Sequence, residues 1–257
     1  MGGLTVLAEL VRALPGEDFL YLGDTARVPY GSRSSRTVQR YSFEVADYLL
    51  ERDVKLLVIA CNTATAHAEV ALAERMPVPV LGVVRPGVEA LLNKTQNRRV
   101  GVIGTRATIR SGTYEEALRQ REPAVRIFSR ACPLFVPLVE EGWQDKRITS
   151  LVVQEYLSEM VREEIDSIIL GCTHYPLLKQ AITAEYPDLN LIDSSEEIAR
   201  AVGELLTREN LRNDRAQGTP GSVRIFLTDV TDQMQRLEQL FYGMHIDSLE
   251  EIALEEG

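Results

Sequence analysis

Residues 58–72 read VIACNTATAHAEVAL, and residues 168–182 read IILGCTHYPLLKQAI. In both stretches an apolar run rich in β-branched residues is followed by a cysteine, a polar pair and an amphipathic segment. A short apolar run of this kind is typical of a buried parallel strand, and the periodic segment after it is typical of a helix. The two stretches therefore predict one strand–turn–helix unit in each half of the chain.

The same alternation extends in both directions from these two units. Strands are expected at 18–24, 55–60, 78–84, 98–105, 124–132, 166–171, 189–195 and 223–229. Helices are expected at 4–13, 35–51, 63–75, 147–163, 174–185, 195–208 and 231–241, with a loop and a helix through 111–121 and a last short helix after Gly243. This alternation predicts an α/β fold with two doubly wound, flavodoxin-like parallel sheets. The first domain is expected to span 1–90 and 205–257, and the second 91–204.

The composition argues against a nucleic-acid-binding or membrane protein. The chain has 257 residues, of which 45% are hydrophobic and 26% charged, and its formal net charge is −10. Because phosphate contacts need a basic face, this charge argues against a nucleic-acid partner. The N-terminal stretch lacks the pattern of a signal peptide, and no apolar run approaches the roughly 20 residues that cross a bilayer, so no membrane association is expected.

The three cysteines are widely spaced and form no CxxC pair. This spacing favours free thiols in a reducing cytoplasm over a disulfide framework. Neither the cysteines nor the histidines have the spacing of zinc ligands, so no metal is expected.

Two of the cysteines, Cys61 and Cys172, lie where an expected strand ends and a helix begins. Ligands bind at the carboxyl ends of the strands in open α/β sheets. Free N–H groups and the helix dipole at such a place are expected to lower a thiol pKa. His174 follows Cys172 closely enough to exchange a proton with a nearby group. A lone cysteine is more often a buried small hydrophobe, which is our interpretation of Cys132, but two in matching contexts favour function.

A matched pair of thiols suits the inversion of an amino-acid α-carbon. One group removes a proton from one face of the carbon and the other returns a proton to the opposite face. One sulfur must therefore be a thiolate while the other is a thiol. A thiol redox protein is a weaker interpretation because a CxxC pair is absent.

Other polar clusters lie at the ends of expected strands. Backbone N–H groups of the loop at 23–31 and of GTRAT (104–108) are candidates for binding a carboxylate. The segment 137–142 carries Glu140 and Glu141, which could assist His174, bind a substrate ammonium group, or simply end a solvated helix. Asp193 is expected to cap a helix.

Six segments together resemble bacterial glutamate racemases, of the aspartate/glutamate racemase family, and they occur in the family's order over nearly the whole chain. They are GGLTVL (2–7), LGDTARVPYG (22–31), ACNTA (60–64), GTRAT (104–108), ACPLFVPLVEEG (131–142) and GCTHYPLL (171–178). The resemblance implies interconversion of L- and D-glutamate without pyridoxal phosphate, metal or other cofactor, supplying D-glutamate for peptidoglycan. It also implies an active site in the cleft between the two domains, and often a homodimer.

The resemblance further implies roles for individual residues. Cys61 would act on the D-enantiomer and Cys172 on the L-enantiomer, with His174 assisting Cys172. Glu140 matches the family's auxiliary carboxylate, with Glu141 as the alternative. Substrate-binding positions by this resemblance are Tyr30, Gly31, Asn62, Thr63, Thr105, Thr108, Thr173 and His174.

One departure from the family concerns the N-terminus. Family members have a short strand and an Asp-Ser pair before the glycines that correspond to Gly2 and Gly3. We therefore expect that the native start lies upstream, by about ten residues on ordinary strand length. Two alternatives stay open: a racemase of aspartate or a related acid, and a truncated chain that only binds or regulates.

Overall fold

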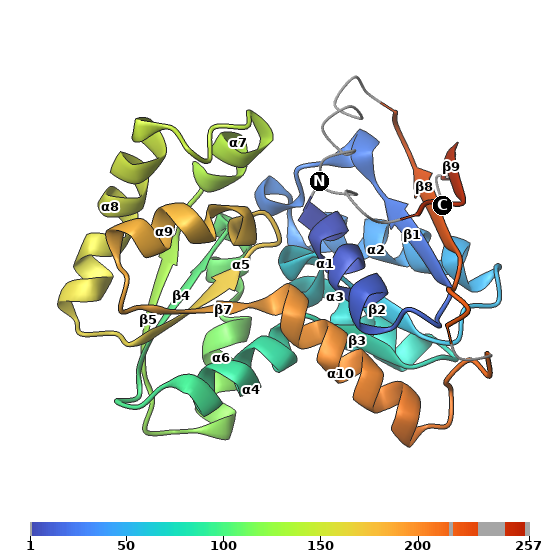
Figure 1. Ribbon diagram of the computed structural model, residues 1–257, viewed down its shortest axis with the longest axis horizontal. Coiled ribbons are helices and arrows are strands. Elements are labelled where there is room, and N and C mark those ends of the chain that lie inside the picture. The colour runs from blue at the N-terminus through green and yellow to red at the C-terminus, as the bar shows by residue number, and fades with distance from the viewer. Residues whose placement is uncertain (1, 216–217, 231–244, 255–257) are drawn as a thin grey trace.

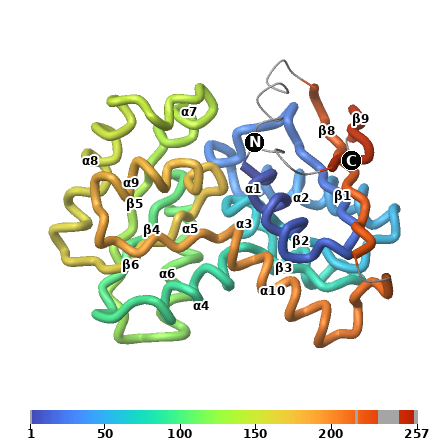
Figure 2. The backbone as a smooth tube through the Cα atoms, viewed as in Figure 1, coloured from blue at the N-terminus to red at the C-terminus, as the bar shows by residue number. Residues whose placement is uncertain are grey.

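The computed structural model describes residues 2–215, 218–230 and 245–254. It has two α/β lobes whose paired strands are all parallel among these residues (Figure 1). The chain passes from the first lobe to the second after β3 (Val80–Gly82) and returns after β7 (Asn190–Asp193), as Figure 2 shows. The predicted parallel α/β class with two lobes is thereby confirmed. The domain boundaries near residues 90 and 204 stay a prediction.

The second lobe contains a four-stranded sheet in the order β5-β4-β6-β7. Its strands are β4 (Arg99–Gly104), β5 (Arg126–Ala131), β6 (Ser167–Gly171) and β7. Its helices are α4 (Val84–Lys94), α5 (Arg106–Ser111), α6 (Thr113–Arg121), α7 (Phe135–Glu140), α8 (Arg147–Arg162), the 3₁₀ turn η3 (Tyr175–Leu178) and α9 (Lys179–Glu185).

The central strand β6 is buried along its whole length, which explains its unbroken apolar run. Because side chains alternate along a strand, Ile168 and Leu170 pack among α7, α8 and α9 on one face. Ile169 packs on the other face with residues of α4 and α6. Both faces of this sheet are therefore covered by helices. Side chains that contact a ligand must then lie at the ends of the strands.

The first lobe holds two smaller sheets, ordered β1-β8-β9 and β2-β3. Its strands are β1 (Phe19–Gly23), β2 (Leu57–Ile59), β3, β8 (Val223–Leu227) and β9 (Ser248–Glu251). Its helices are α1 (Gly2–Ala13), α2 (Ser35–Leu50), α3 (Asn62–Arg75) and α10 (Ser194–Arg208), with short 3₁₀ turns η1 (Thr25–Arg27) and η2 (Tyr30–Ser32). Helices α1 and α10 pack together through a shared apolar cluster.

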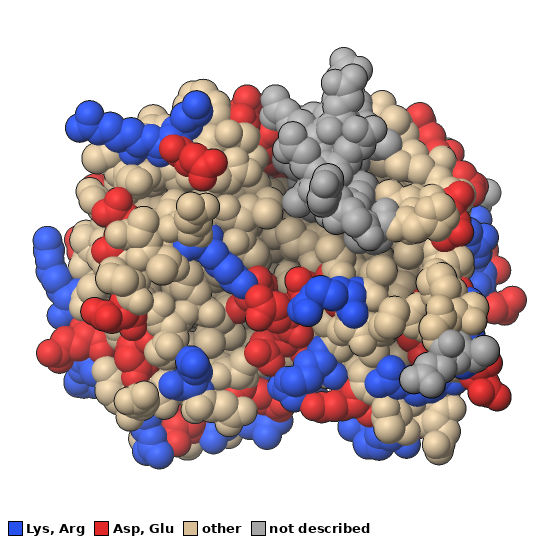
Figure 3. All heavy atoms as spheres, in the orientation of Figure 1, with Lys and Arg blue, Asp and Glu red and all other residues tan. Residues whose placement is uncertain are grey.

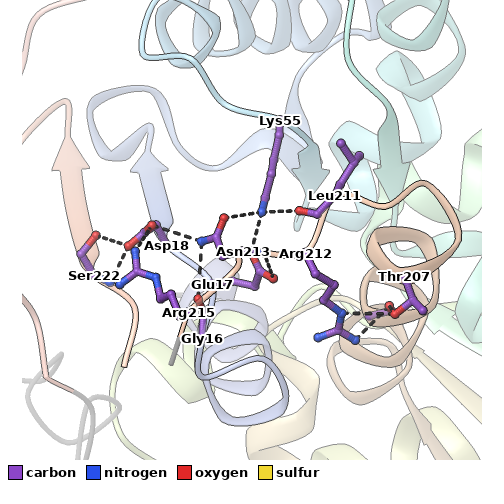
Figure 4. A network of polar contacts seen from close by, with 11 residues as sticks. Gly16, Glu17, Asp18, Lys55, Thr207, Leu211, Arg212, Asn213, Arg215 and Ser222 are labelled. Atoms are coloured by element: carbon purple, nitrogen blue, oxygen red, sulfur yellow. Dashed lines mark hydrogen bonds and ion pairs between the residues drawn. The ribbon is translucent and has the colours of Figure 1, made fainter. Parts of the chain in front are cut away.

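A groove of about 480 Å³ separates β1 from β2. Leu7 and Leu10 of α1, Tyr21 of β1 and Val58 of β2 contribute to its walls. A polar network closes one end, where Lys55 Nζ donates to Glu17 Oε2 at 2.6 Å and to Asn213 Oδ1 at 2.7 Å (Figure 4). The neighbouring edges of β1 and β2 pair with no strand among the described residues.

Some sequence expectations need correction. The tail after Gly243 contains strand β9 rather than a helix, and it pairs with β8. Its Leu249 pairs with Ile225, and the consecutive Glu250 and Glu251 are exposed at the edge of the sheet, where charged residues are common. The strand expected at 78–84 ends at Gly82, and Pro86 lies in the first turn of α4, where the missing N–H of proline is tolerated. The helix expected at 231–241 lies outside the described residues.

The surface carries both signs of charge. On the face shown in Figure 3, lysine and arginine side chains are interspersed with aspartate and glutamate. None of the helices among the described residues has the length and apolar character required to cross a membrane.

Candidate active site

Cys61 is the residue that precedes α3 at the carboxyl end of β2. The Thr63 and Ala64 backbone N–H groups and the Thr63 hydroxyl stabilise a thiolate there, as expected at a helix N-terminus. Desolvation by burial is the larger effect, however, and it raises the pKa of the Cys61 thiol above its ordinary value. The predicted lowering of this pKa is therefore wrong, because burial outweighs the donors at the helix N-terminus.

Cys172 lies at the carboxyl end of β6 and is buried. Burial raises its pKa to about 12, and a backbone hydrogen bond from His174 opposes this only in part. The charges of Cys61 and Glu140 raise the pKa of Cys172 further, so the two cysteines are near enough to interact. The expected α-helix does not begin directly after Cys172. The 3₁₀ turn η3 precedes α9, so a weaker dipole faces this sulfur.

His174 lies between Cys172 and Glu140. Its Nδ1 atom is 3.8 Å from the Cys172 sulfur, and its Nε2 atom is 3.3 Å from Glu140 Oε1. The His174 imidazole is the main cause that lowers the pKa of the Glu140 carboxyl. Helix α7 ends at Glu140, whereas Glu141 is exposed. The structure thus brings Glu140, and not Glu141, to the imidazole.

Three threonine hydroxyls join the two lobes. Thr63 Oγ1 of α3 lies 3.1 Å from Thr105 Oγ1 and 3.1 Å from Thr108 Oγ1, at the start of α5. The latter two oxygens are 3.0 Å apart. Gly31 packs against this cluster, because a Cβ at Gly31 would lie 2.9 Å from Thr105 Cβ. Four of the expected substrate-binding residues are thereby brought together.

Tyr30 is placed differently from the other expected ligands. Its hydroxyl donates to the carboxylate of Asp24, which also accepts from Arg27. Burial first, and the Asp24 carboxylate second, raise the pKa of Tyr30 above its ordinary value. The tyrosine is therefore a neutral donor already engaged within its own loop. Asp24 is a residue whose part in this loop the sequence analysis did not single out.

The turn that carries Cys172 also contacts the start of α1. Thr5 Oγ1 donates to the backbone carbonyl of Thr173 at 3.1 Å. A Cβ at Gly2 would lie 2.7 Å from His174 Nδ1, so only glycine fits there without displacing the imidazole. Thr173 is buried beneath this contact.

Asn62 has a partner that sequence analysis missed. The buried Tyr114 hydroxyl, from α6 of the second lobe, donates to Asn62 Oδ1 at 2.5 Å. Tyr114 lies in the stretch SGTYEEAL, where its only sequence signal is an aromatic residue at the start of an amphipathic helix. Because the contact joins two lobes, spacing along the chain gives no sign of it.

Cys61 and Cys172 thus lie at matching strand ends of two α/β lobes. The family model for Asp/Glu/Hydantoin racemase matches residues 2–202, and the chain belongs to this family. A glutamate racemase of Geobacter metallireducens is 46% identical over 99% of this chain and 94% of its own length. One from Persephonella marina is 48% identical over 97% of this chain and 94% of its own length.

Solved structures agree with this assignment. Glutamate racemase from Bacillus anthracis has a TM-score of 0.92 and 37% identity, covering 98% of this chain and 94% of its own. Glutamate racemase from Francisella tularensis in complex with D-glutamate has a TM-score of 0.91 and 36% identity, covering 99% of this chain and 94% of its own.

Proposed function

We propose that this protein interconverts L- and D-glutamate by proton transfer at the α-carbon, without a cofactor. The observation that carries the proposal is the placement of Cys61 and Cys172. Each lies at the carboxyl end of a parallel strand in its own lobe, and the charge of Cys61 raises the pKa of Cys172. The relatives named above, which are glutamate racemases, support glutamate as the substrate.

The proposed reaction moves one proton in each of two steps. The Cys172 thiolate removes the α-proton of L-glutamate and becomes a thiol, leaving a planar carbanion. The Cys61 thiol then donates its proton to the opposite face, which gives D-glutamate and a Cys61 thiolate. The reverse reaction uses the same groups in exchanged roles.

The surrounding polar groups would hold the substrate during these steps. The hydroxyls of Thr63, Thr105 and Thr108, which already exchange hydrogen bonds, can turn toward a carboxylate. His174, supported by the Glu140 carboxylate, would hold a proton for exchange with Cys172. Binding contributions are also proposed for Tyr30, Gly31, Asn62 and Thr173.

The pH dependence follows from the raised thiol pKa values. Since reaction needs one thiolate and one thiol, the active form is the pair with one proton removed. That form is scarce at neutral pH because burial raises both pKa values. We expect kcat/KM to rise up to about tenfold per pH unit between about pH 7 and pH 9. Because the enantiomers are equally stable, the two directions must give the same kcat/KM profile. A flat profile, with circular dichroism confirming the fold at each pH, would contradict this expectation.

Glu140→Gln tests the auxiliary carboxylate. The substitution keeps the shape of the side chain but removes the negative charge beside His174. We expect kcat to fall by about tenfold, the size of one charge-assisted hydrogen bond. Glu141→Gln is the matched control, because Glu141 is exposed and should leave kcat within about twofold. If the two substitutions lowered kcat equally, Glu140 would have no specific role in the proposed mechanism.

Incubation with L-glutamate in deuterated buffer tests the function itself. The proposal requires loss of optical rotation and incorporation of deuterium at the α-carbon, with no added cofactor. L-aspartate in a parallel incubation separates the two acidic substrates. A folded protein that neither exchanges nor racemises glutamate would refute the proposed activity.

The physiological setting belongs to the proposal as well. The three cysteines are free, which suits a reducing cytoplasm. In that compartment the reaction would supply D-glutamate for peptidoglycan. Assembly into a homodimer stays a prediction from the family resemblance.

A further inference from the structure

The Asn62 side chain is buried but only half satisfied. Asn62 is 2% exposed, and its Oδ1 atom accepts the Tyr114 hydrogen bond. Its Nδ2 atom is also buried and has no hydrogen-bond partner among the residues that the structure describes. A buried N–H donor without a partner is costly, so an unpaired amide beside Cys61 points to a ligand oxygen that completes it.

The Tyr114 contact lies on the oxygen side of the Asn62 amide. Because the phenol donates to Oδ1, the NH₂ group is left for another partner.

Tyr114 is suited to act as the donor. It is 2% exposed, and burial raises the pKa of its phenol above the ordinary value, so it keeps its proton. Its other polar neighbour, Ser194 Oγ, lies 3.5 Å away and can donate to the carbonyl of Leu170 at 3.3 Å. The phenol proton is thus directed to Asn62, across the junction of the two lobes.

We propose that Tyr114 is a positioning residue that orients the Asn62 amide to donate from Nδ2 to a carboxylate oxygen of the substrate. The inference rests on the proposed function, since it names the substrate's carboxylate as the missing acceptor. Tyr114 itself does not touch the reacting atoms. Its hydrogen bond prevents the Asn62 amide from rotating. A rotated amide would direct Oδ1, rather than Nδ2, toward the substrate carboxylate.

The test is steady-state kinetics of Tyr114→Phe with both enantiomers of glutamate. The substitution removes one hydroxyl and keeps the ring in the core. We expect KM to rise about tenfold with kcat within about twofold, because an interaction made equally in the bound ground state and transition state is lost. A purely structural role would lower the active fraction, and therefore apparent kcat, without changing KM.

Tyr175→Phe is the matched control. Tyr175 is also buried, and its hydroxyl donates to the backbone carbonyl of Cys132 at 2.8 Å, away from Asn62. Both substitutions remove one buried tyrosine hydrogen bond and should lower the melting temperature, but only Tyr114→Phe should raise KM. Asn62→Ala completes a double-mutant cycle. In the Asn62→Ala background, Tyr114→Phe should have no further effect on KM.

Glutamate binding measured by calorimetry separates this inference from the proposed activity. Suppose that the wild-type protein binds glutamate but does not racemise it. The proposed activity is then refuted, but the inference about Tyr114 still requires the Kd for glutamate to be about tenfold higher in Tyr114→Phe. An unchanged KM and Kd in Tyr114→Phe, or independent effects in the cycle, would overturn the inference. Absence of glutamate binding to the wild-type protein would overturn it too.

Discussion

Cys61→Ala and Cys172→Ala should each lower kcat for racemisation by roughly 10³-fold, within the range for removal of a positioned acid–base group. Neither methyl side chain can exchange a proton. Because each thiol serves one face of the α-carbon, either loss stops inversion in both directions. Rotation of polarised light by L- and D-glutamate solutions measures the effect.

Deuterium exchange makes this result specific. In Cys61→Ala, the remaining Cys172 should still exchange the α-proton of one enantiomer without inverting it, and Cys172→Ala should do the same for the other enantiomer. Cys132→Ala is the control, because Cys132 is buried in the core of the second lobe and should retain racemisation. Exchange of both enantiomers by either single variant would rule out one thiol per face.

Phe135→Ala should lower the free energy of unfolding by about 3–5 kcal/mol, the usual cost of deleting a buried aromatic ring. Phe135 is fully buried, and its ring meets those of Tyr156 and Tyr175 edge-on, each at 5.2 Å. Tyr175 follows the turn of Cys172 and His174, so the cavity should also loosen that turn and lower kcat. Urea unfolding and steady-state kinetics of the same preparation measure the two effects.

The adjacent Leu134 provides the comparison for Phe135. It is 52% exposed, so Leu134→Ala should change the free energy of unfolding by no more than about 0.5 kcal/mol. If the two substitutions destabilised the protein equally, the aromatic cluster would not be the support of the site that we describe.

Local pattern was enough to predict most of the fold. The apolar run before Cys172 became the fully buried strand β6, and both cysteines were expected at the strand ends where they lie. Turn chemistry was less informative. The strand expected at 78–84 ends at Gly82, and α4 begins at Val84 with Pro86 in its first turn.

Properties that depend on the enclosed site could not be predicted from spacing. The sequence indicated N–H donors near Cys61, and these are present, but the burial that raises the pKa of its thiol depends on the folded chain around it. The choice between Glu140 and Glu141 required the end of α7 to be placed against His174. The contact of Tyr114 with Asn62 depends on how the lobes meet, and local sequence pattern does not encode it.

The divided sheet of the first lobe bears on how copies of this protein behave toward each other. Unpaired strand edges are templates for edge-to-edge aggregation, and natural proteins guard them with charge. Arg52, Lys55 and Arg224 line the groove beside β1 and β2, together with Glu17, Asp18 and Asp53. A strand from a second molecule would have to desolvate these charged side chains to enter the groove. Charges of both signs along the groove therefore disfavour association of two copies through these strand edges.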